Sequence, residues 1–374
     1  MARTLKSDRV LFVVTLLLVC SSIVMVYSAS AVQALDRQGS PSAVMLRQLV
    51  WAVLGVVAML VAMRIDYHEL RRPVVIWWLV GITVAALVAV FFFEARNSTR
   101  RWILFGPFSL QPSELAKLTA IIFAAALLER RMHRVNELGY AVAPIGVIAI
   151  GLTSLILYQP DFGTAVVLIA VVCAVVFGAG LSYRYLAGTF LLLLPAAIAL
   201  VVMSPYRMRR VFAFLNPEQD PLGASYQLNQ SLIAIGSGGG FGRGLMDGVQ
   251  KLYYIPESHT DFIYAVVGEE LGLVGTTAIL ACFAIITWRG LRASLVAPDR
   301  FGALLGIGLT LMVSLQAFVN MSVVLGLGPT KGIPLPFVSN GGSSLVVSLI
   351  AMGILLNISQ QGSPGAAAAL EARG

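Results

Sequence analysis

The sequence predicts an all-α polytopic membrane protein with about ten transmembrane helices, both termini in the cytoplasm and one long extracytoplasmic loop. Two observations predict this fold class. Charged residues make up only 12% of the 374 residues and hydrophobic residues 58%, whereas soluble domains carry roughly 25% charged residues. Apolar runs long enough to cross a ~30 Å hydrocarbon core recur along the whole chain, so a single membrane anchor does not explain the composition.

The predicted spans follow one another with mostly short links. The first has a basic start like that of a signal peptide, but it is too long for a signal h-region and is interpreted as an uncleaved helix. Residues 1–361 are expected to form one transmembrane domain with a large loop at 204–259, followed by a flexible cytoplasmic tail at 362–374. The ten spans are placed at roughly 10–29, 44–63, 73–93, 112–128, 139–157, 162–180, 182–203, 260–288, 302–324 and 342–360.

The distribution of Lys and Arg sets the predicted orientation. With the N-terminus inside, 14 of the 26 basic residues fall on the cytoplasmic side, as the positive-inside rule favours. The other 12 fall outside, and several of them lie in 204–259 or just before the fourth span. We interpret this outer excess as the electrostatic footprint of an anionic ligand.

Polar residues within or beside apolar spans are functional candidates, because a membrane makes them costly. The stretch 111–114 (QPSE) is typical of a helix start, and Glu114 and Lys117 share a helix face. A helix cap with a local ion pair accounts for these residues. Against that interpretation, Lys117 lies a turn or more inside an apolar run, and Arg101, which precedes the stretch, suits a phosphate.

Two further groups are predicted on the same side of the membrane. Asp161 stands between the fifth and sixth spans, where it either caps the sixth helix or faces an outer cavity. The loop 204–259 carries Arg207, Arg210 and the run GSGGGFGRG. Its GxGxxG-like spacing is a weak nucleotide signal, because no strand precedes it. The glycines favour a close approach of the backbone to a ligand or a re-entrant turn.

The segment PESHTDF contains His259 and Asp261 and leads into the eighth span. Glu269 and Glu270 follow eight and nine residues after Asp261, deeper in the same helix. Asp261 could cap this helix. Three carboxylates in one segment that enters the membrane favour a general base instead.

The Pro- and Gly-rich stretch 328–344 precedes the tenth span and carries Lys331 and Ser339. It is either a plain turn or the wall of a groove. Gln316 and Asn320, four residues apart in the ninth span, add polar groups on one helix face. The three cysteines and three histidines are scattered and show no metal-ligand spacing, so no metal site is predicted, nor is a nucleic-acid partner.

Four of these stretches resemble, in order, the signatures of the SEDS family of bacterial cell-wall glycosyltransferases, which comprises FtsW, RodA and SpoVE. They read WILFGPFSLQPSELAK, QPDFGTAVVL, PESHTDFIYAVVGEELGLVG and PTKGIPLPFVSNGGSS. The Thr-Lys pair at 330–331 makes the chain more similar to the division branch, FtsW, than to the elongation branch, RodA. Asn340 departs from the Tyr that the family usually has at this position.

The resemblance implies a peptidoglycan glycosyltransferase that polymerises lipid II, the undecaprenyl-pyrophosphate-linked disaccharide-pentapeptide, at the outer face of the bacterial plasma (inner) membrane. It places the protein at the division septum, in a complex with a class B penicillin-binding transpeptidase and other division proteins. It also implies that Asp261 is essential for catalysis. No cofactor is implied; Glu114 could bind Lys117 or, with a divalent cation (Mg²⁺ or Mn²⁺), assist the leaving group.

We therefore expect Asp261 to be the base that activates the acceptor hydroxyl, as one carboxylate does in an inverting glycosyl transfer. Basic side chains would neutralise the pyrophosphate, which guanidinium groups match with paired hydrogen bonds. The substrate-binding candidates are Arg101, Glu114, Lys117, Asp161, Arg207, Arg210, His259, Lys331 and Ser339.

Three other functions would use the same residues differently. A lipid II flippase would need cavity charges reachable from both sides, whereas the charged motifs crowd the outer half. An ion-coupled transporter often shows internal repeats with paired broken helices, and no such repeat is evident. A scaffold for division proteins would leave Asp261 dispensable. Within the family, the elongation-type polymerase is the alternative to the division enzyme.

Overall fold

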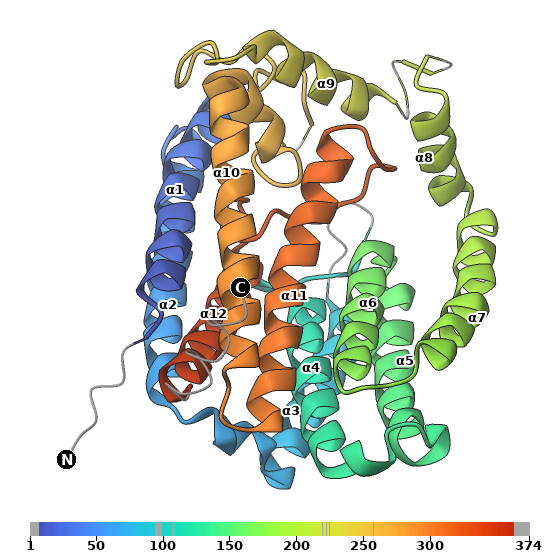
Figure 1. Ribbon diagram of the computed structural model, residues 1–374. Helices are drawn as coiled ribbons and strands as arrows, with labels where there is room; N and C mark the ends of the chain where they lie inside the picture. The colour runs from blue at the N-terminus through green and yellow to red at the C-terminus, as the bar shows by residue number, and fades with distance from the viewer. Residues whose placement is uncertain are drawn as a thin grey trace.

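The computed structural model describes residues 7–93, 99–106, 108–218, 220–221, 223, 225–256 and 258–362. Ten of its helices coincide with the ten predicted spans, which confirms the all-α membrane fold (Figure 1). In the described chain, eight helices are long and apolar enough to cross a membrane. The other two are α6, which is apolar but has 17 residues, and α4, which contains a buried ion pair. Nearly all of the predicted tail at 362–374 lies outside the described residues.

The elements follow in chain order. They are α1 (Arg9–Gln38), α2 (Ala43–Arg64), η1 (Tyr67–Arg71), α3 (Pro73–Ala89), η2 (Val90–Phe92), β1 (Ile103–Phe105), β2 (Phe108–Leu110), α4 (Pro112–Arg131), η3 (Met132–Arg134), η4 (Leu138–Val142), α5 (Ala143–Tyr158), α6 (Phe162–Gly178), α7 (Tyr183–Val202), α8 (Pro205–Leu215), α9 (Tyr226–Gly238), α10 (Ile263–Leu295), α11 (Arg300–Val324) and α12 (Gly342–Gln361).

Local sequence signals set where the helices near the site begin. A carboxylate oxygen of Asp161 accepts a hydrogen bond from the Thr164 amide (3.3 Å), which caps α6. Pro112 occupies the first turn of α4, where its missing N–H leaves no hydrogen bond unmade. Both predicted helix starts are confirmed. Asp261 differs, because Phe262, and not Asp261, holds the N-cap position of α10.

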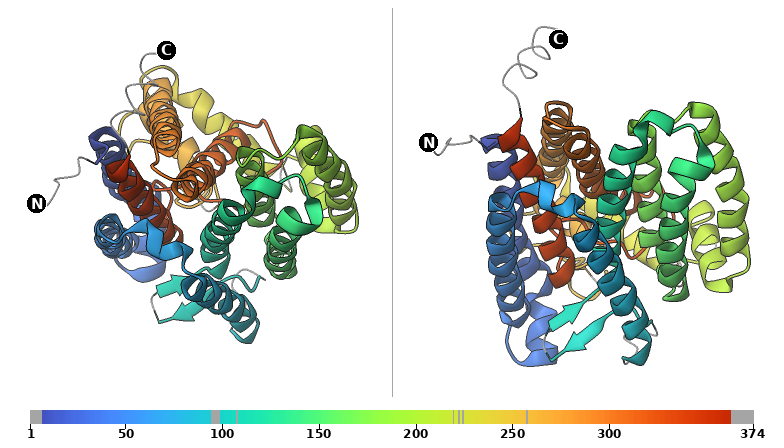
Figure 2. Two further views of the ribbon diagram at one scale, coloured as in Figure 1. Left: turned by 60° about the horizontal axis from the view of Figure 1, so that its bottom comes forward. Right: turned by 90° about the horizontal axis from the view of Figure 1, so that it is seen from below.

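Helices α11 and α12 form the buried centre of the bundle. Most of each is buried, and α12 packs along α2 while α11 packs against α10, α4 and α6. The approach of α12 to α2 requires Gly353, since a Cβ there would lie 2.5 Å from the Met59 carbonyl oxygen. Figure 2 shows α12 between α2 and the remaining helices. The polar residues of α11 therefore sit on a well-packed support.

Helix α7 stands apart from this centre, at the edge of the bundle (Figure 1). None of the residues in its apolar window is buried, and its main neighbours are α6 and α8. Pro195 lies inside the helix. The bundle therefore has a tightly packed side around α12 and a loosely packed side at α7.

The long segment 204–259 contains two helices, where none was expected. Helices α8 and α9 lie over one end of the bundle (Figure 1). Helix α9 packs closely on α10, because a Cβ at Gly238 would lie 2.0 Å from the Gly268 carbonyl oxygen. This glycine serves contact between two backbones. The approach to a ligand or a re-entrant turn stays a prediction for the rest of the run.

The two ends of the bundle are distinct. The Asp8 amide donates to Ser359 Oγ (3.2 Å), so the start of α1 and the end of α12 are neighbours. The antiparallel hairpin β1–β2, in which Ile103 pairs with Leu110, lies at the opposite end (Figure 2). Residues just before α4 are thereby held at the end that carries α8 and α9.

Candidate active site

Two side-chain amides on α11 hold the Pro- and Gly-rich loop, residues 325–341, against the start of α10. Asn320 Nδ2 donates to the carbonyl oxygens of Asp261 (2.8 Å) and Ile333 (2.7 Å). Gln316 Nε2 donates to the next carbonyl of the loop (3.0 Å). Since both amides lie on a buried helix, the backbone at Asp261 and the loop are fixed relative to each other.

Ser339 provides a second connection between these segments. Its hydroxyl donates to the Thr260 carbonyl oxygen (2.5 Å) and accepts from the Leu335 amide (2.8 Å). The neighbouring Asn340 amide donates to the His259 carbonyl oxygen (3.0 Å). Ser339 is buried, so its contacts in the structure are those of a residue that positions the 259–261 backbone.

The side chains of Asp261 and Arg101 both lie next to Gly332. A Cβ at Gly332 would lie 3.1 Å from Asp261 Oδ2 and 3.9 Å from Arg101 Nη1. Both side chains are partly exposed. The Arg101 guanidinium donates to the carbonyl oxygens of Gln159 (3.3 Å) and Pro160. A carboxylate and a guanidinium from distant parts of the sequence thus lie at one partly exposed site next to Gly332.

Asp161 lies behind Arg101 and is buried. Its carboxylate accepts hydrogen bonds from Gln111 Nε2 (3.0 Å), Ser113 Oγ (3.3 Å) and Thr164 Oγ1 (2.9 Å), in addition to the capped amide. Four donors on one carboxylate join the start of α4 to the start of α6. The structure therefore confirms the helix cap. Asp161 also contacts the 111–114 stretch, but its burial does not support the alternative of a carboxylate that faces an outer cavity.

Three more cations gather beside this place, around Phe162 and the loop. Arg207 Cζ and Lys331 Nζ lie 5.3 Å and 5.2 Å from the centre of the Phe162 ring, within the range of cation–π attraction. Arg210 donates to the Thr330 carbonyl oxygen (2.9 Å). Burial lowers the pKa of Lys331 below its usual 10.5. Helix α8 and the loop thus add positive charge next to Asp261 and Arg101.

Glu114 and Lys117 form a fully buried pair inside α4 (Nζ to Oε1, 3.0 Å). Lys117 also donates to the Gln316 side chain, and Glu114 Oε2 accepts from Ser344 Oγ (3.2 Å). Both carboxylate oxygens of Glu114 therefore have partners. The described residues contain no group of three or more His, Cys, Asp or Glu side chains placed to hold a metal ion. Of the two alternatives for Glu114, the contact with Lys117 is the one observed, and a cation does not fit its partners.

Glu269 and Glu270 are fully buried and serve the segment that precedes Asp261. Glu269 Oε1 accepts from the amides of Val249 (2.8 Å) and Gln250 (3.2 Å). Glu270 Oε1 accepts from Lys251 Nζ (2.6 Å). The three carboxylates of this segment thus have different surroundings, since two of them fasten the 246–251 backbone.

The predicted residues form two sets in space. Behind the site, buried side chains hold its segments together: Glu114, Lys117, Asp161 and Ser339. At the site, five groups contact Phe162, the loop or one another: Asp261, Arg101, Arg207, Arg210 and Lys331. Phe162 and Gly332 were not anticipated. Both directly follow a candidate residue, and both lie within stretches that resemble the family signatures.

Comparisons with known proteins agree on one family. The family model for FtsW, RodA and SpoVE, described as "Cell cycle protein", matches residues 8–363. A protein of Trichlorobacter lovleyi named probable peptidoglycan glycosyltransferase FtsW is 43% identical and covers 96% of this chain and 94% of its own. Stage V sporulation protein E of Bacillus subtilis is 40% identical, covering 94% and 97%.

Solved structures show the same fold. One chain from a study of "Structural coordination of polymerization and crosslinking by a peptidoglycan synthase complex" superposes with a TM-score of 0.78 at 31% identity, covering 95% of this chain and 98% of its own. The rod shape determining protein RodA of Thermus thermophilus superposes with a TM-score of 0.69 at 26% identity, covering 95% and 97%.

Proposed function

This chain belongs to the FtsW/RodA/SpoVE family, and from that premise we propose that it is a peptidoglycan glycosyltransferase that polymerises lipid II at the outer face of the plasma membrane during cell division. The observation that carries the proposal is that Asp261 and Arg101 both lie next to Gly332, with further cations beside them. Relatives named peptidoglycan glycosyltransferase FtsW support the division role.

The reaction joins the 4-hydroxyl of an acceptor sugar to the anomeric carbon of a donor sugar. The new C–O bond forms as the bond from the anomeric carbon to the pyrophosphate oxygen breaks, and undecaprenyl pyrophosphate leaves with the electron pair. Asp261 removes the proton of the attacking hydroxyl. A positioned base of this kind accelerates such reactions about 10²- to 10⁴-fold. Asn320 and Ser339 keep the Asp261 backbone in place for this step.

The leaving group accumulates negative charge on its pyrophosphate, so it requires nearby positive charge. The four cations of the site supply it from separate elements: Arg101 before β1, Arg207 and Arg210 on α8, and Lys331 in the loop. Guanidinium groups bind phosphate oxygens through paired hydrogen bonds. Fixed charges aimed at a developing anion lower the barrier without reorganising in the transition state.

The buried residues that pack against the site hold these cations in position. Lys117 reaches Gln316, and Gln316 reaches the loop, so the buried pair in α4 is coupled to the position of Lys331. Asp161 holds the backbone whose carbonyls receive Arg101. In this proposal, Glu114, Lys117 and Asp161 are positioning residues. His259 contributes through its backbone carbonyl, which Asn340 binds.

The partner and location follow from the same premise. A class B penicillin-binding transpeptidase is the proposed partner, since the structural relative comes from a complex that couples polymerisation with crosslinking. The termini and the basic short loops face the cytoplasm in this proposal, and α8, α9 and the site face outward. The protein then works in the inner membrane at the division septum.

The proposed activity is tested with the purified full-length chain, its transpeptidase partner and labelled lipid II. We expect a ladder of glycan strands that a muramidase digests. A separate assay follows lipid II across the bilayer of sealed vesicles. Translocation without any polymer, from a sample that is folded and bound to the partner, would refute the enzyme and support the flippase.

A further inference from the structure

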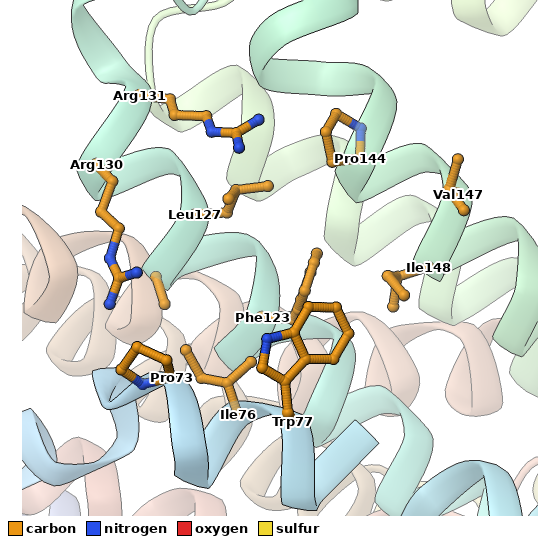
Figure 3. A pocket seen from close by; sticks show the side chains of 11 residues that line it. Pro73, Ile76, Trp77, Phe123, Leu127, Arg130, Arg131, Pro144, Val147 and Ile148 are labelled. Atoms are coloured by element: carbon orange, nitrogen blue, oxygen red, sulfur yellow. The ribbon is translucent and has the colours of Figure 1, made fainter. Parts of the chain in front are cut away.

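A groove opens at the end of the bundle opposite the candidate active site, between α3, α4 and α5 (Figure 3). Its volume is about 330 Å³, and its lining is apolar apart from the two arginines at the end of α4. Trp77 and Phe123 meet edge to face on its floor, with ring centres 6.0 Å apart. Val147 lines the opposite wall and is largely exposed. An open apolar groove on a membrane-spanning bundle faces lipid chains.

Arg130 and Arg131 stand at one end of the groove (Figure 3). Arg130 Nη2 donates to the Arg71 carbonyl oxygen (3.0 Å), and Arg131 donates to the Tyr140 carbonyl oxygen and lies over the Tyr140 ring. Among the described residues, neither guanidinium has a carboxylate within ion-pair distance. Nearby acids are already paired with other arginines: Glu69 with Arg72, Glu129 with Arg71 and Glu137 with Arg134.

The end of a helix explains only part of this arrangement. Cations in the last turn of α4 suit the helix dipole, but the dipole does not account for an apolar groove that begins below them. Two cations that are adjacent in sequence, without an acidic partner in the described part of the chain, lie above an apolar groove. This arrangement matches the headgroup and the acyl chain of an anionic phospholipid. A phosphate with two oxygens can accept from both guanidinium groups.

The groove is separate from the candidate active site. Helix α4 starts beside Asp161 and ends at Arg131, and its 20 residues span about 30 Å. The arginines therefore lie across the membrane from Asp261, on the side that carries the short basic loops. This placement suits a lipid of the cytoplasmic leaflet, whose anionic headgroups attract such residues.

We infer that this groove binds one anionic phospholipid of the cytoplasmic leaflet, with its phosphate on Arg130 and Arg131 and an acyl chain along Trp77, Phe123 and Val147. The lipid fills the space between α3 and α5 on the lipid-facing side of α4. Its negative charge offsets part of the positive charge of the two arginines at the membrane boundary.

Native mass spectrometry of the full-length protein, released from detergent with added lipid, tests the inference. The probes are phosphatidylglycerol, phosphatidylcholine with the same acyl chains, and inorganic phosphate. We expect one tight phosphatidylglycerol site, and R130Q/R131Q weakens its binding about tenfold. The control R64Q/R184Q removes two exposed arginines from the same end of the bundle and leaves that binding unchanged.

A second variant distinguishes the contribution of the apolar groove from that of the two arginines. V147W fills the groove while both arginines remain, and we expect it to weaken phosphatidylglycerol binding as well. Equal binding of phosphatidylglycerol and phosphatidylcholine would overturn the headgroup assignment. An equal loss of lipid binding in R130Q/R131Q and in R64Q/R184Q would overturn the proposed lipid site. The proposal would also fail if inorganic phosphate bound in a way that depends on Arg130 and Arg131 while V147W bound lipid normally.

Discussion

Asp261 and the pair Glu269 and Glu270 lie within ten residues of one another, yet their surroundings differ in every respect. Asp261 is partly exposed, precedes α10 and lies next to Gly332, as does the Arg101 guanidinium. Glu269 and Glu270 are fully buried inside α10. Their oxygens accept from backbone amides and from Lys251.

The difference separates a carboxylate that can accept a substrate proton from carboxylates that hold the protein's own segments in place. Buried acids whose oxygens all accept hydrogen bonds have no position left for a substrate proton, and they cannot change charge without breaking their contacts. Asp261 owes its position to contacts of its backbone carbonyl with Asn320. Its side chain stays at an accessible surface, where a sugar hydroxyl can reach it.

The largest effect is expected at Asp261. We predict that D261N lowers the rate of lipid II polymerisation by at least about a hundredfold, because it removes the base. Its melting temperature should stay close to that of the wild type. The control D247N neutralises an exposed carboxylate of the same outer region and should retain full turnover. A matching loss in D247N would show that net charge matters and not the position of Asp261.

Substitution of Glu270 should lower the stability of the fold, with little direct effect on the rate of lipid II polymerisation. Removing it in E270A leaves Lys251 buried without its carboxylate, which typically costs about 3–5 kcal/mol of unfolding free energy. Thermal unfolding in detergent measures this loss. The double variant E270M/K251M replaces both charges and should recover most of the stability. If E270A melts like the wild type, the buried pair does not fasten the 246–251 segment.

Adjacent arginines offer a sharper comparison within the cation cluster. R101Q removes the guanidinium beside Asp261 and should lower kcat/KM for lipid II about tenfold or more. R100Q removes an exposed neighbour that donates to the Phe91 carbonyl oxygen, and it should change kcat/KM by less than about threefold. Steady-state polymerisation assays measure both. Equal losses would mean that only the overall charge of the segment counts.

The smallest effect is expected in the alkaline limb of the pH profile. Burial lowers the pKa of Lys331, so this lysine loses its charge at a lower pH than an exposed lysine does. Activity that depends on the charge should therefore decline as pH rises toward that lowered pKa. K331R keeps its charge throughout, because arginine remains protonated, and should flatten this limb. An unchanged limb in K331R would remove Lys331 from the charge requirement.

The bundle was predictable because the membrane imposes one rule on every span. Each helix must carry an apolar run of sufficient length, and all ten runs became helices. Helix α8 has only 11 residues and an apolar face on one side, so it gives no such signal. The cap at Asp161 was also readable, since capping depends on residues three positions apart.

The placement of Asp261 and Arg101 next to Gly332 could not be read from the sequence. It depends on Gly332, where a Cβ would lie 3.1 Å from Asp261 Oδ2, and on Asn320, which ties two segments together. Both conditions are long-range contacts. The role of Glu269 was hidden for the same reason, because its partners are backbone amides, which every residue type carries.

The rate of lipid II polymerisation per folded molecule, measured for D261N and E269Q side by side, tests the central claim most directly. The two variants make the same chemical change at acids eight residues apart. We predict at least about a hundredfold loss for D261N and, once the unfolded fraction is subtracted, a loss within about tenfold for E269Q. Normal polymerisation by D261N, or an equal loss in both variants, would contradict the assignment of Asp261 as the base.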